Sequence, residues 1–390
     1  MKEDKDRKLT QKKEHRITTV RGFLYFIFDF NKKENVVRNI FYRGHSDKTY
    51  DLEPSIYRKD KKTNKLLYIE NEDKIYRETI VKVPYDFSGK NTIESLVLMQ
   101  HYGVPTRILD LTTNPLVALY FACVENENED GEVIVFDIPQ ESTCYFDSDR
   151  IAVLANLAKY ENDFYYKKEK FYESKIKEVR SKINQIKIKT NNSENPKILF
   201  DYAFSNKERL KKYFEENKLQ NIDQEIEKIV SEYDKDIDDE SKKHMRTQLL
   251  LMLEKNMSEK QQEVIITINK QYLEKLLHYI KEDKPYFKPI INPNHIGRIF
   301  AIKPKLDNPR IVRQYGAFLI FGAKENNKEM PRVEHNWIIA GKNSPLGKRI
   351  IIDHKSKEDI LNELDILGIN KSTLFPEIDK VADYIKEKLF

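Results

Sequence analysis

Residues 94–124 read ESLVLMQHYGVPTRILDLTTNPLVALYFACV, and their pattern predicts two helices joined by a short buried strand. Asn114 can accept a main-chain hydrogen bond as an N-cap, and Pro115 suits the first turn of the helix that follows. The run 116–124 is apolar on every side and too short to cross a membrane. It therefore predicts a helix inside the protein core.

The polar residues of this stretch concentrate in the two loops beside the start of the buried helix. Such a concentration is unusual for a purely structural region, because every buried polar group must find a hydrogen-bond partner. The loops therefore resemble a binding site. Arg107 and Asp110 are alternatively a buried pair that braces the two loops. The residues concerned are Gln100, His101, Tyr102, Thr106, Arg107, Asp110, Thr112 and Thr113.

Arg43 is a further candidate site residue. It lies in the run VVRNIFYRGHSD at 36–47, whose alternation predicts a strand. Gly44 beside it allows another backbone or a ligand to come close. A guanidinium near the end of a buried strand needs an anion, either a carboxylate of the protein or a phosphate of a ligand. Sequence alone leaves both partners open.

The other elements predict an α+β fold with a mixed or antiparallel β core and packed helices. After a mobile tail at 1–16, a helix is expected over 17–30, and a buried strand over 132–139. Two helices are expected to close the chain. Later strands are expected within 297–305, 310–322, 335–341 and 348–353.

Residues 161–283 differ in character from the rest, because Lys and Glu dominate and apolar residues recur at helical spacing. They predict a charged helical insertion that divides one domain into an N-terminal part, 17–160, and a C-terminal part, 284–390. The insertion is either an arm that binds a protein partner or a second copy of the chain, or a solvated helical elaboration.

Composition narrows the class of protein. The 69 basic and 64 acidic residues nearly cancel to a net charge of +5, so charge does not mark a nucleic-acid surface. The two cysteines cannot build a disulfide framework or a zinc site. The N-terminus lacks an apolar signal segment, and no apolar run approaches membrane-spanning length. A cytoplasmic protein without membrane contact is expected.

Several reaction classes lack their sequence motifs. The chain contains no P-loop, no GxSxG elbow and no HExxH helix. The stretch 94–124 also holds no pair of carboxylates for two-metal hydrolysis. No metal is therefore expected at the candidate site.

Two of these motifs resemble the FRG domain family. The first is FYRG at 41–44, and the second is QHYGVPTRILDLTTNPLVALYFA at 100–122. Further pieces similar to the family are LEPSIYR at 52–58, SDRIAVLANLA at 148–158, RIVRQYGAFLIF at 310–321 and the ending at 360–385. The resemblance covers both ends of the chain and omits the insertion.

A more remote resemblance, to the ADP-ribosyltransferase superfamily, implies a fold and site roles. In chain order, Arg43 would hold the phosphates of NAD, Thr112 would support the nicotinamide-side ribose, and Gln314 stands where a Glu usually stabilises the cationic centre. His101 is a further catalytic candidate. The resemblance implies NAD as a substrate. The candidate cofactor-binding residues are Arg43, Gly44, Gln100, Tyr102, Thr106, Arg107, Asp110 and Thr113.

Two functions are expected, the first from these resemblances and the second from binding through Arg43, Arg107 and the loop histidines. The first is an effector or toxin of bacterial conflict, of the anti-phage or toxin-antitoxin type, that acts on NAD as an ADP-ribosyltransferase or NAD glycohydrolase. Its acceptor would be a protein or a nucleic acid. The second is a non-catalytic module that binds a nucleotide or nucleic acid, with the helical insertion as its partner-binding arm.

Overall fold

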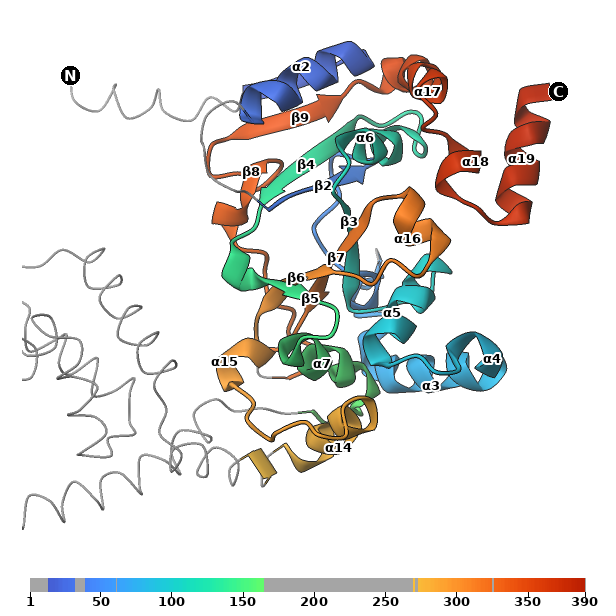
Figure 1. Cartoon of the computed structure of the whole chain (residues 1–390). Coiled ribbons are helices and arrows are strands. Elements are labelled where there is room, and N and C mark those ends of the chain that lie inside the picture. Colours follow the sequence, from blue (N-terminus) through green and yellow to red (C-terminus); the bar gives the residue numbers. More distant parts are fainter. Residues whose placement is uncertain are drawn as a thin grey trace, which may run out of the picture. The chain divides into compact units, whose positions relative to one another are not determined.

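A computed structural model describes residues 13–31, 39–60, 62–164, 269–270, 273–324 and 326–389 (Figure 1). The chain divides into two compact units. One comprises 1–164, 282–285 and 294–390, and the other comprises 165–281 and 286–293. Most of the predicted insertion 161–283 lies outside the described residues. None of the described helices is long and apolar enough to cross a membrane.

A mixed sheet of nine strands forms the centre of the larger unit, as far as its described residues show. The order along the sheet is β1-β9-β4-β2-β3-β7-β6-β5, and β8 pairs with β4. This confirms the predicted α+β class. The strands are β1 (Lys13–Ile17), β2 (Ile40–His45), β3 (Ile108–Thr112), β4 (Gly131–Asp137), β5 (Thr143–Tyr145), β6 (Ile299–Lys303), β7 (Gly316–Phe321), β8 (Ile338–Ala340) and β9 (Lys348–Ile352).

Helices connect many of these strands, and three more described helices follow the last strand, β9. The prediction of a core helix is confirmed in α6, where Asn114 Oδ1 accepts a hydrogen bond from Leu116 N at 2.9 Å. The described helices are α2 (Val20–Asn31), α3 (Glu72–Lys82), α4 (Pro84–Phe87), α5 (Thr92–His101), α6 (Pro115–Cys123), α7 (Asp149–Asn156), α14 (Glu274–Asp283), α15 (Pro293–Ile296), α16 (Pro309–Arg313), α17 (Lys357–Ile366), α18 (Lys371–Leu374) and α19 (Ile378–Leu389).

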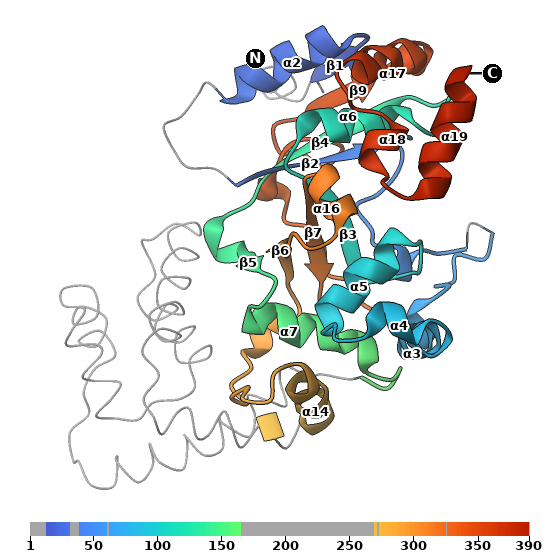
Figure 2. The same cartoon turned by 45° about the vertical axis from the view of Figure 1, so that its right-hand side comes forward.

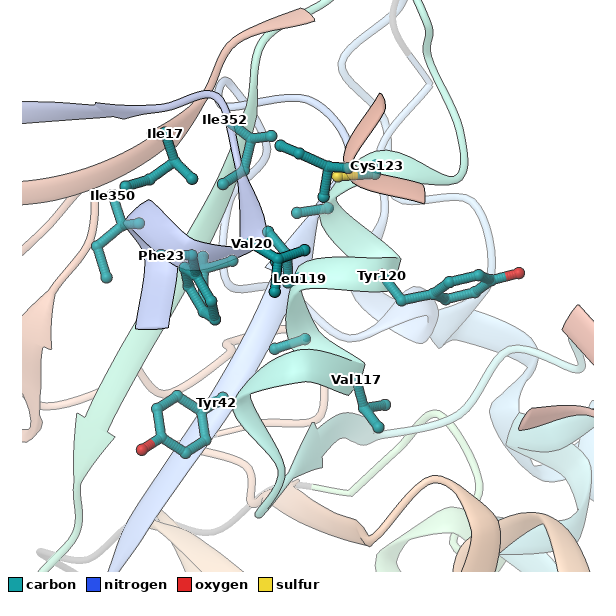
Figure 3. Packing of buried hydrophobic residues seen from close by; sticks show 14 of the residues in the cluster. Ile17, Val20, Phe23, Tyr42, Val117, Leu119, Tyr120, Cys123, Ile350 and Ile352 are labelled. Carbon is teal, nitrogen blue, oxygen red and sulfur yellow. The ribbon is translucent and has the colours of Figure 1, made fainter. Parts of the chain in front are cut away.

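Strand β4 is buried on both faces, which explains its continuous apolar run. Successive side chains of a strand point to opposite faces. Val133 and Val135 therefore pack into one core cluster, with α2, α6 and β9. Ile134 and Phe136 pack into a second cluster with β3, β6 and β7. Figure 3 shows the first cluster around α6.

The sheet splits between β2 and β3. These antiparallel strands pair at only one position, Tyr42 opposite Thr112. Beyond it, β2 continues beside β4 and β3 continues beside β7. In Figure 1, β2, β4 and β9 accordingly lie above β3, β7 and β6.

Helix α6 lies directly on β2 and β4 because glycine faces it on both strands. A Cβ atom on Gly44 would lie 2.6 Å from Ala122 N and closer still to Ala118 O. A Cβ atom on Gly131 would collide with Ala122 O in the same way. The close approach predicted at Gly44 is therefore made by the backbone of α6.

Two sequence expectations are wrong. Part of the predicted tail at 1–16 is strand β1, which pairs in parallel with β9. The segment 310–313, expected to be a strand, is helix α16. Asn308 and Pro309 begin that helix as Asn114 and Pro115 begin α6, and Asn308 Oδ1 accepts from Arg310 N at 2.8 Å.

Candidate functional site

A cavity of about 970 Å³ adjoins the split in the sheet. Residues from β2, β3, α5, α6 and α16 line one part of it, and residues from α17, α18 and α19 line another. In both views α16 lies between α6 and α5 (Figures 1 and 2). The cavity therefore gathers segments that are far apart in the chain.

Most of the predicted site residues line this cavity. Those that line it are Arg43, Gly44, Gln100, His101, Asp110, Thr112 and Gln314. Four others do not line it: Tyr102 and Thr113 are exposed, while Thr106 and Arg107 are buried.

Arg43 occupies the split itself. Its Nη1 donates to the main-chain oxygen of Asp110 at 2.7 Å, and its Nε donates to His45 Nε2 at 3.0 Å. Among the described residues it forms no ion pair with a carboxylate. Burial lowers the pKa of the guanidinium; Asp110 opposes this effect, and the cation of Arg58 adds to it. The side chain remains charged, because arginine does not lose its proton in proteins.

His45 is a cavity-lining residue that sequence reasoning missed. Since Arg43 Nε always carries a proton, His45 Nε2 must accept, and the neutral ring then carries its proton on Nδ1. Burial and the nearby cations Arg43 and Lys342 lower the pKa of His45 to about 2. Its Nδ1 is buried and has no hydrogen-bond partner in the described part of the chain.

Arg58 is a second residue that the sequence did not single out. It is exposed, lines the cavity and follows the short 3-10 turn Ser55–Tyr57. Arg58 and Arg43 line the same cavity, and the cation of Arg58 contributes to lowering the pKa of Arg43. The only sequence signal was the family-like piece at 52–58. Two nearby cations in one cavity favour an anionic ligand.

A chain of hydrogen bonds leads from Thr106, in the loop before β3, through Gln100 of α5 to Asp110 of β3. Thr106 Oγ1 donates to Gln100 Oε1 at 2.7 Å, and Gln100 Nε2 donates to Asp110 Oδ2 at 2.7 Å. Thr106, though buried at 1% exposure, is thus connected to the site through Gln100. The role of these hydrogen bonds is to orient the Asp110 carboxylate, and not every residue in the series contacts a ligand.

Thr112 and Gln314 are engaged within the protein. Thr112 Oγ1 donates to the main-chain oxygen of Gln314 at 2.7 Å and accepts from Asn114 N at 3.0 Å. Gln314 Nε2 donates to the main-chain oxygen of Leu374 at 3.1 Å. Gln314 is the C-cap of α16 rather than a strand residue. These contacts join the starts of α6 and β7 to α18.

His101 ends α5 at the cavity wall. Arg310 Nη1 donates to its main-chain oxygen at 2.6 Å, and Asn308 Nδ2 lies 3.4 Å from its Nδ1. Burial lowers the pKa of His101, against the opposing effect of Asp110. The ring is therefore neutral near pH 7, and it can donate or accept but adds no cation to the site.

Arg107 belongs to the scaffold. It is fully buried and pairs with Glu72, with Nε 2.9 Å from Oε1, while its Nη1 donates to Phe321 O at 3.1 Å. The proposed pairing of Arg107 with Asp110 is therefore wrong, because Glu72 supplies the carboxylate. Its burial also removes Arg107 from the residues that can reach a ligand in the cavity.

The C-terminal helices α17, α18 and α19 contribute residues to one wall of the cavity. Helix α19 contains no buried residue. Polar contacts hold it: Tyr384 Oη donates to Asp365 Oδ1 at 2.6 Å, and Lys388 pairs with the other oxygen of Asp365. Phe121 of α6 lies edge-on to Phe375, with ring centroids 6.1 Å apart. This wall therefore supplies aromatic rings as well as charged groups.

One cluster among the described residues has the ligand types for a metal ion: Asp130, Asp353 and His354. These residues do not line the cavity. Asp130 already pairs with Arg16 at 3.1 Å and Lys48 at 2.9 Å. An added metal ion would have to displace these cations, so the cluster is better explained as a structural network.

A comparison with known protein families identifies residues 38–131, which supply part of the cavity lining. Residues 38–131 match the family model described as the FRG domain. The matched range includes β2, α5, β3 and α6, which carry Arg43 and Asp110 into the cavity. No curated protein and no solved structure matches the chain significantly. Residues 38–131 of this chain therefore carry an FRG domain.

Proposed function

We propose that the cavity binds NAD and that the protein acts on it as an ADP-ribosyltransferase or NAD glycohydrolase. The observation that carries this proposal is Arg43, a cation inside a cavity without a carboxylate partner among the described residues. A buried charge is stable only when an opposite charge compensates it. A phosphate group of the ligand would supply that charge.

Arg58 extends the argument from one phosphate to two. Two guanidinium groups that repel each other are stabilised together by an anion with several acceptor oxygens. A pyrophosphate fits this requirement, and guanidinium groups bind it with paired N–H donors. The cavity volume of about 970 Å³ is also at the upper end of the usual range for ligand sites.

The proposed reaction breaks the bond between ribose C1′ and the nicotinamide nitrogen. Nicotinamide leaves with the electron pair, and the oxygen of water or of an acceptor attacks C1′ and loses its proton. A carboxylate stabilises the cationic ribose in such reactions. The order of Arg43, Thr112 and Gln314 supports the remote resemblance to ADP-ribosyltransferases. Gln314 Nε2 is engaged with Leu374 O, so the side-chain oxygen of Gln314 is the atom that would face the cationic ribose, as a neutral and therefore weaker stabiliser than a carboxylate.

The biological setting belongs to the same proposal. An FRG-domain enzyme that consumes NAD or modifies a protein or nucleic acid suits a cytoplasmic effector or toxin in anti-phage defence or a toxin-antitoxin pair. Release of nicotinamide from NAD by the purified full chain, with and without cell extract or nucleic acid, tests the activity. Release that disappears in Arg43→Ala is expected. An absence of release under every condition would contradict the proposal.

A second candidate is a non-catalytic module that binds a nucleotide or nucleic acid. It is favoured by Gln314, a neutral amide where a Glu is usual, whose Nε2 is held by Leu374 O. This function predicts that nucleotide raises the melting temperature of the protein without being consumed. Residues 161–283 would then serve as an arm for a protein partner or a second copy. Comparing the solution mass of the full chain with that of a chain lacking 161–283 tests the arm.

A further inference from the structure

We infer that Asp110 recognises a ribose of the ligand, so that the cavity selects ribonucleotides over nucleotides that lack the ribose hydroxyls. This inference rests on the proposed nucleotide ligand, and it names the chemical group that the carboxylate binds. A carboxylate oxygen is a strong acceptor for a ribose hydroxyl, as in dinucleotide-binding proteins.

The orientation of the carboxylate supports this role. Gln100 can present its amide nitrogen to Asp110 because its amide oxygen is already occupied by the hydroxyl of Thr106, at 2.7 Å. The amide nitrogen donates to Asp110 Oδ2, also at 2.7 Å. Oδ1 accepts no hydrogen bond from any described residue. These hydrogen bonds therefore hold Oδ2 of Asp110 and leave Oδ1 available to a ligand in the cavity that Asp110 lines.

The position of Arg43 relates this oxygen to the phosphate site. Arg43 Nη1 donates to the main-chain oxygen of Asp110 at 2.7 Å, so the guanidinium contacts the same residue that carries the carboxylate. A 5′-phosphate and the hydroxyls of its own ribose are separated by a short span. A phosphate at Arg43 would therefore place the adjoining ribose beside Asp110.

Other carboxylates also line the cavity. Glu387 pairs with Lys371, and Glu125 and Glu127 are exposed to solvent. Asp365 also lines the cavity, but Tyr384 and Asn370 bond to its Oδ1 and Lys388 to its Oδ2. His101 near Asp110 is neutral near pH 7, because burial lowers its pKa. Asp110 thus keeps, at the partly buried end of the Gln100 contact, an oxygen that no described residue occupies.

The substitution Asp110→Asn tests the inference with little change to the surroundings. The Asn side-chain oxygen can still accept from Gln100, and its nitrogen then replaces the free acceptor by a donor. The main-chain oxygen that Arg43 contacts is unaffected. The matched control is Asp86→Asn, which removes an exposed carboxylate on α4 that does not line the cavity.

The measurement is calorimetric titration of the full chain with ADP and with 2′,3′-dideoxy-ADP. Wild type and the control should bind ADP about 10- to 100-fold more tightly, as expected for a hydrogen bond to a charged acceptor. In Asp110→Asn the two affinities should become nearly equal. Gln100→Leu should reduce the ratio, because the carboxylate loses its orienting contact while keeping its charge.

The outcomes separate this inference from the proposed activity. No preference in wild type, no ADP binding at all, or an unchanged preference in Asp110→Asn would overturn the inference, even if NAD were consumed. A preference that Asp110→Asn abolishes, in a protein that never releases nicotinamide, would support ribose recognition and contradict only the enzymatic function.

Discussion

Arg107 Nε lies 2.9 Å from Glu72 Oε1, in an ion pair that is almost completely closed to solvent. Arg107 is 0% exposed and Glu72 is 3% exposed. Arg107 also donates to Phe321 O at 3.1 Å. The pair therefore fastens the start of α3 to β3 and the end of β7, and Arg107 stabilises the scaffold on which the cavity is built.

We expect Glu72→Gln to lower the free energy of unfolding by about 3–5 kcal/mol, because it leaves the Arg107 cation buried without its carboxylate. Denaturant titration followed by circular dichroism measures the loss. The control is Glu70→Gln, which breaks an exposed pair with Lys328 and should leave the transition unchanged. Equal transitions for the two variants would show that the buried pair contributes nothing.

We expect Gly44→Ala to destabilise the protein by about 1–3 kcal/mol or more, because the new Cβ atom would collide with the backbone of α6. Thermal unfolding measures this effect. The control is Gly22→Ala within α2, where the nearest atom is the flexible Thr19 Oγ1 at 3.2 Å and alanine favours the helix. A stable Gly44→Ala protein would mean that α6 can move away from the sheet.

The sequence predicted the local parts of the fold well where one signal dominated. Asn114 and Pro115 marked the start of α6, and the apolar run at 132–139 marked β4. The same Asn-Pro signal at 308–309 was overlooked, because β-branched Ile311 and Val312 precede a true strand and favour strand formation. The strand propensity of these residues and the N-cap signal favour different structures, and the segment forms a helix.

The sequence could not predict contacts between distant segments. It identified Arg107 as a charge in need of a partner, but Glu72 lies 35 positions earlier on another helix. Arg58 lies 15 positions after Arg43 and joins it only as a second residue that lines the same cavity. His45, two residues after Arg43 on β2, is instead a local neighbour that strand alternation could have indicated. The local sequence gives the chemical type of a side chain, whereas the partner of a charged side chain depends on how the chain folds.

Stability should fall below neutral pH because His45 is buried in its neutral form. Its pKa of about 2 in the folded protein lies below the value of 6.5 for an unperturbed histidine. The unfolded chain therefore binds a proton that the folded chain excludes, so stability is full above about pH 6.5 and falls as pH decreases toward 2. His45→Asn should make the loss between pH 7 and pH 5 smaller by about 2 kcal/mol. Denaturant titrations of both proteins at the two pH values measure it, and equal losses would contradict neutral burial.

Arg43→Ala separates a ligand-binding arginine from a structural one. Its two partners are a main-chain oxygen and a neutral histidine, so the substitution leaves no buried carboxylate without a partner. We expect a loss of only about 1 kcal/mol in the free energy of unfolding, with loss of nucleotide binding. Denaturant titration and calorimetry with ADP-ribose measure the two effects.

Two further variants sharpen this comparison. Arg43→Lys keeps the positive charge but loses the fork of donors, so it should retain the fold and bind ADP-ribose more weakly than wild type. Arg21→Ala removes an exposed arginine from α2 and should change neither property. If Arg43→Ala instead costs about 3–5 kcal/mol, like the loss of a buried ion pair, then Arg43 is part of the scaffold. The cavity would then lack the cation on which its proposed function depends.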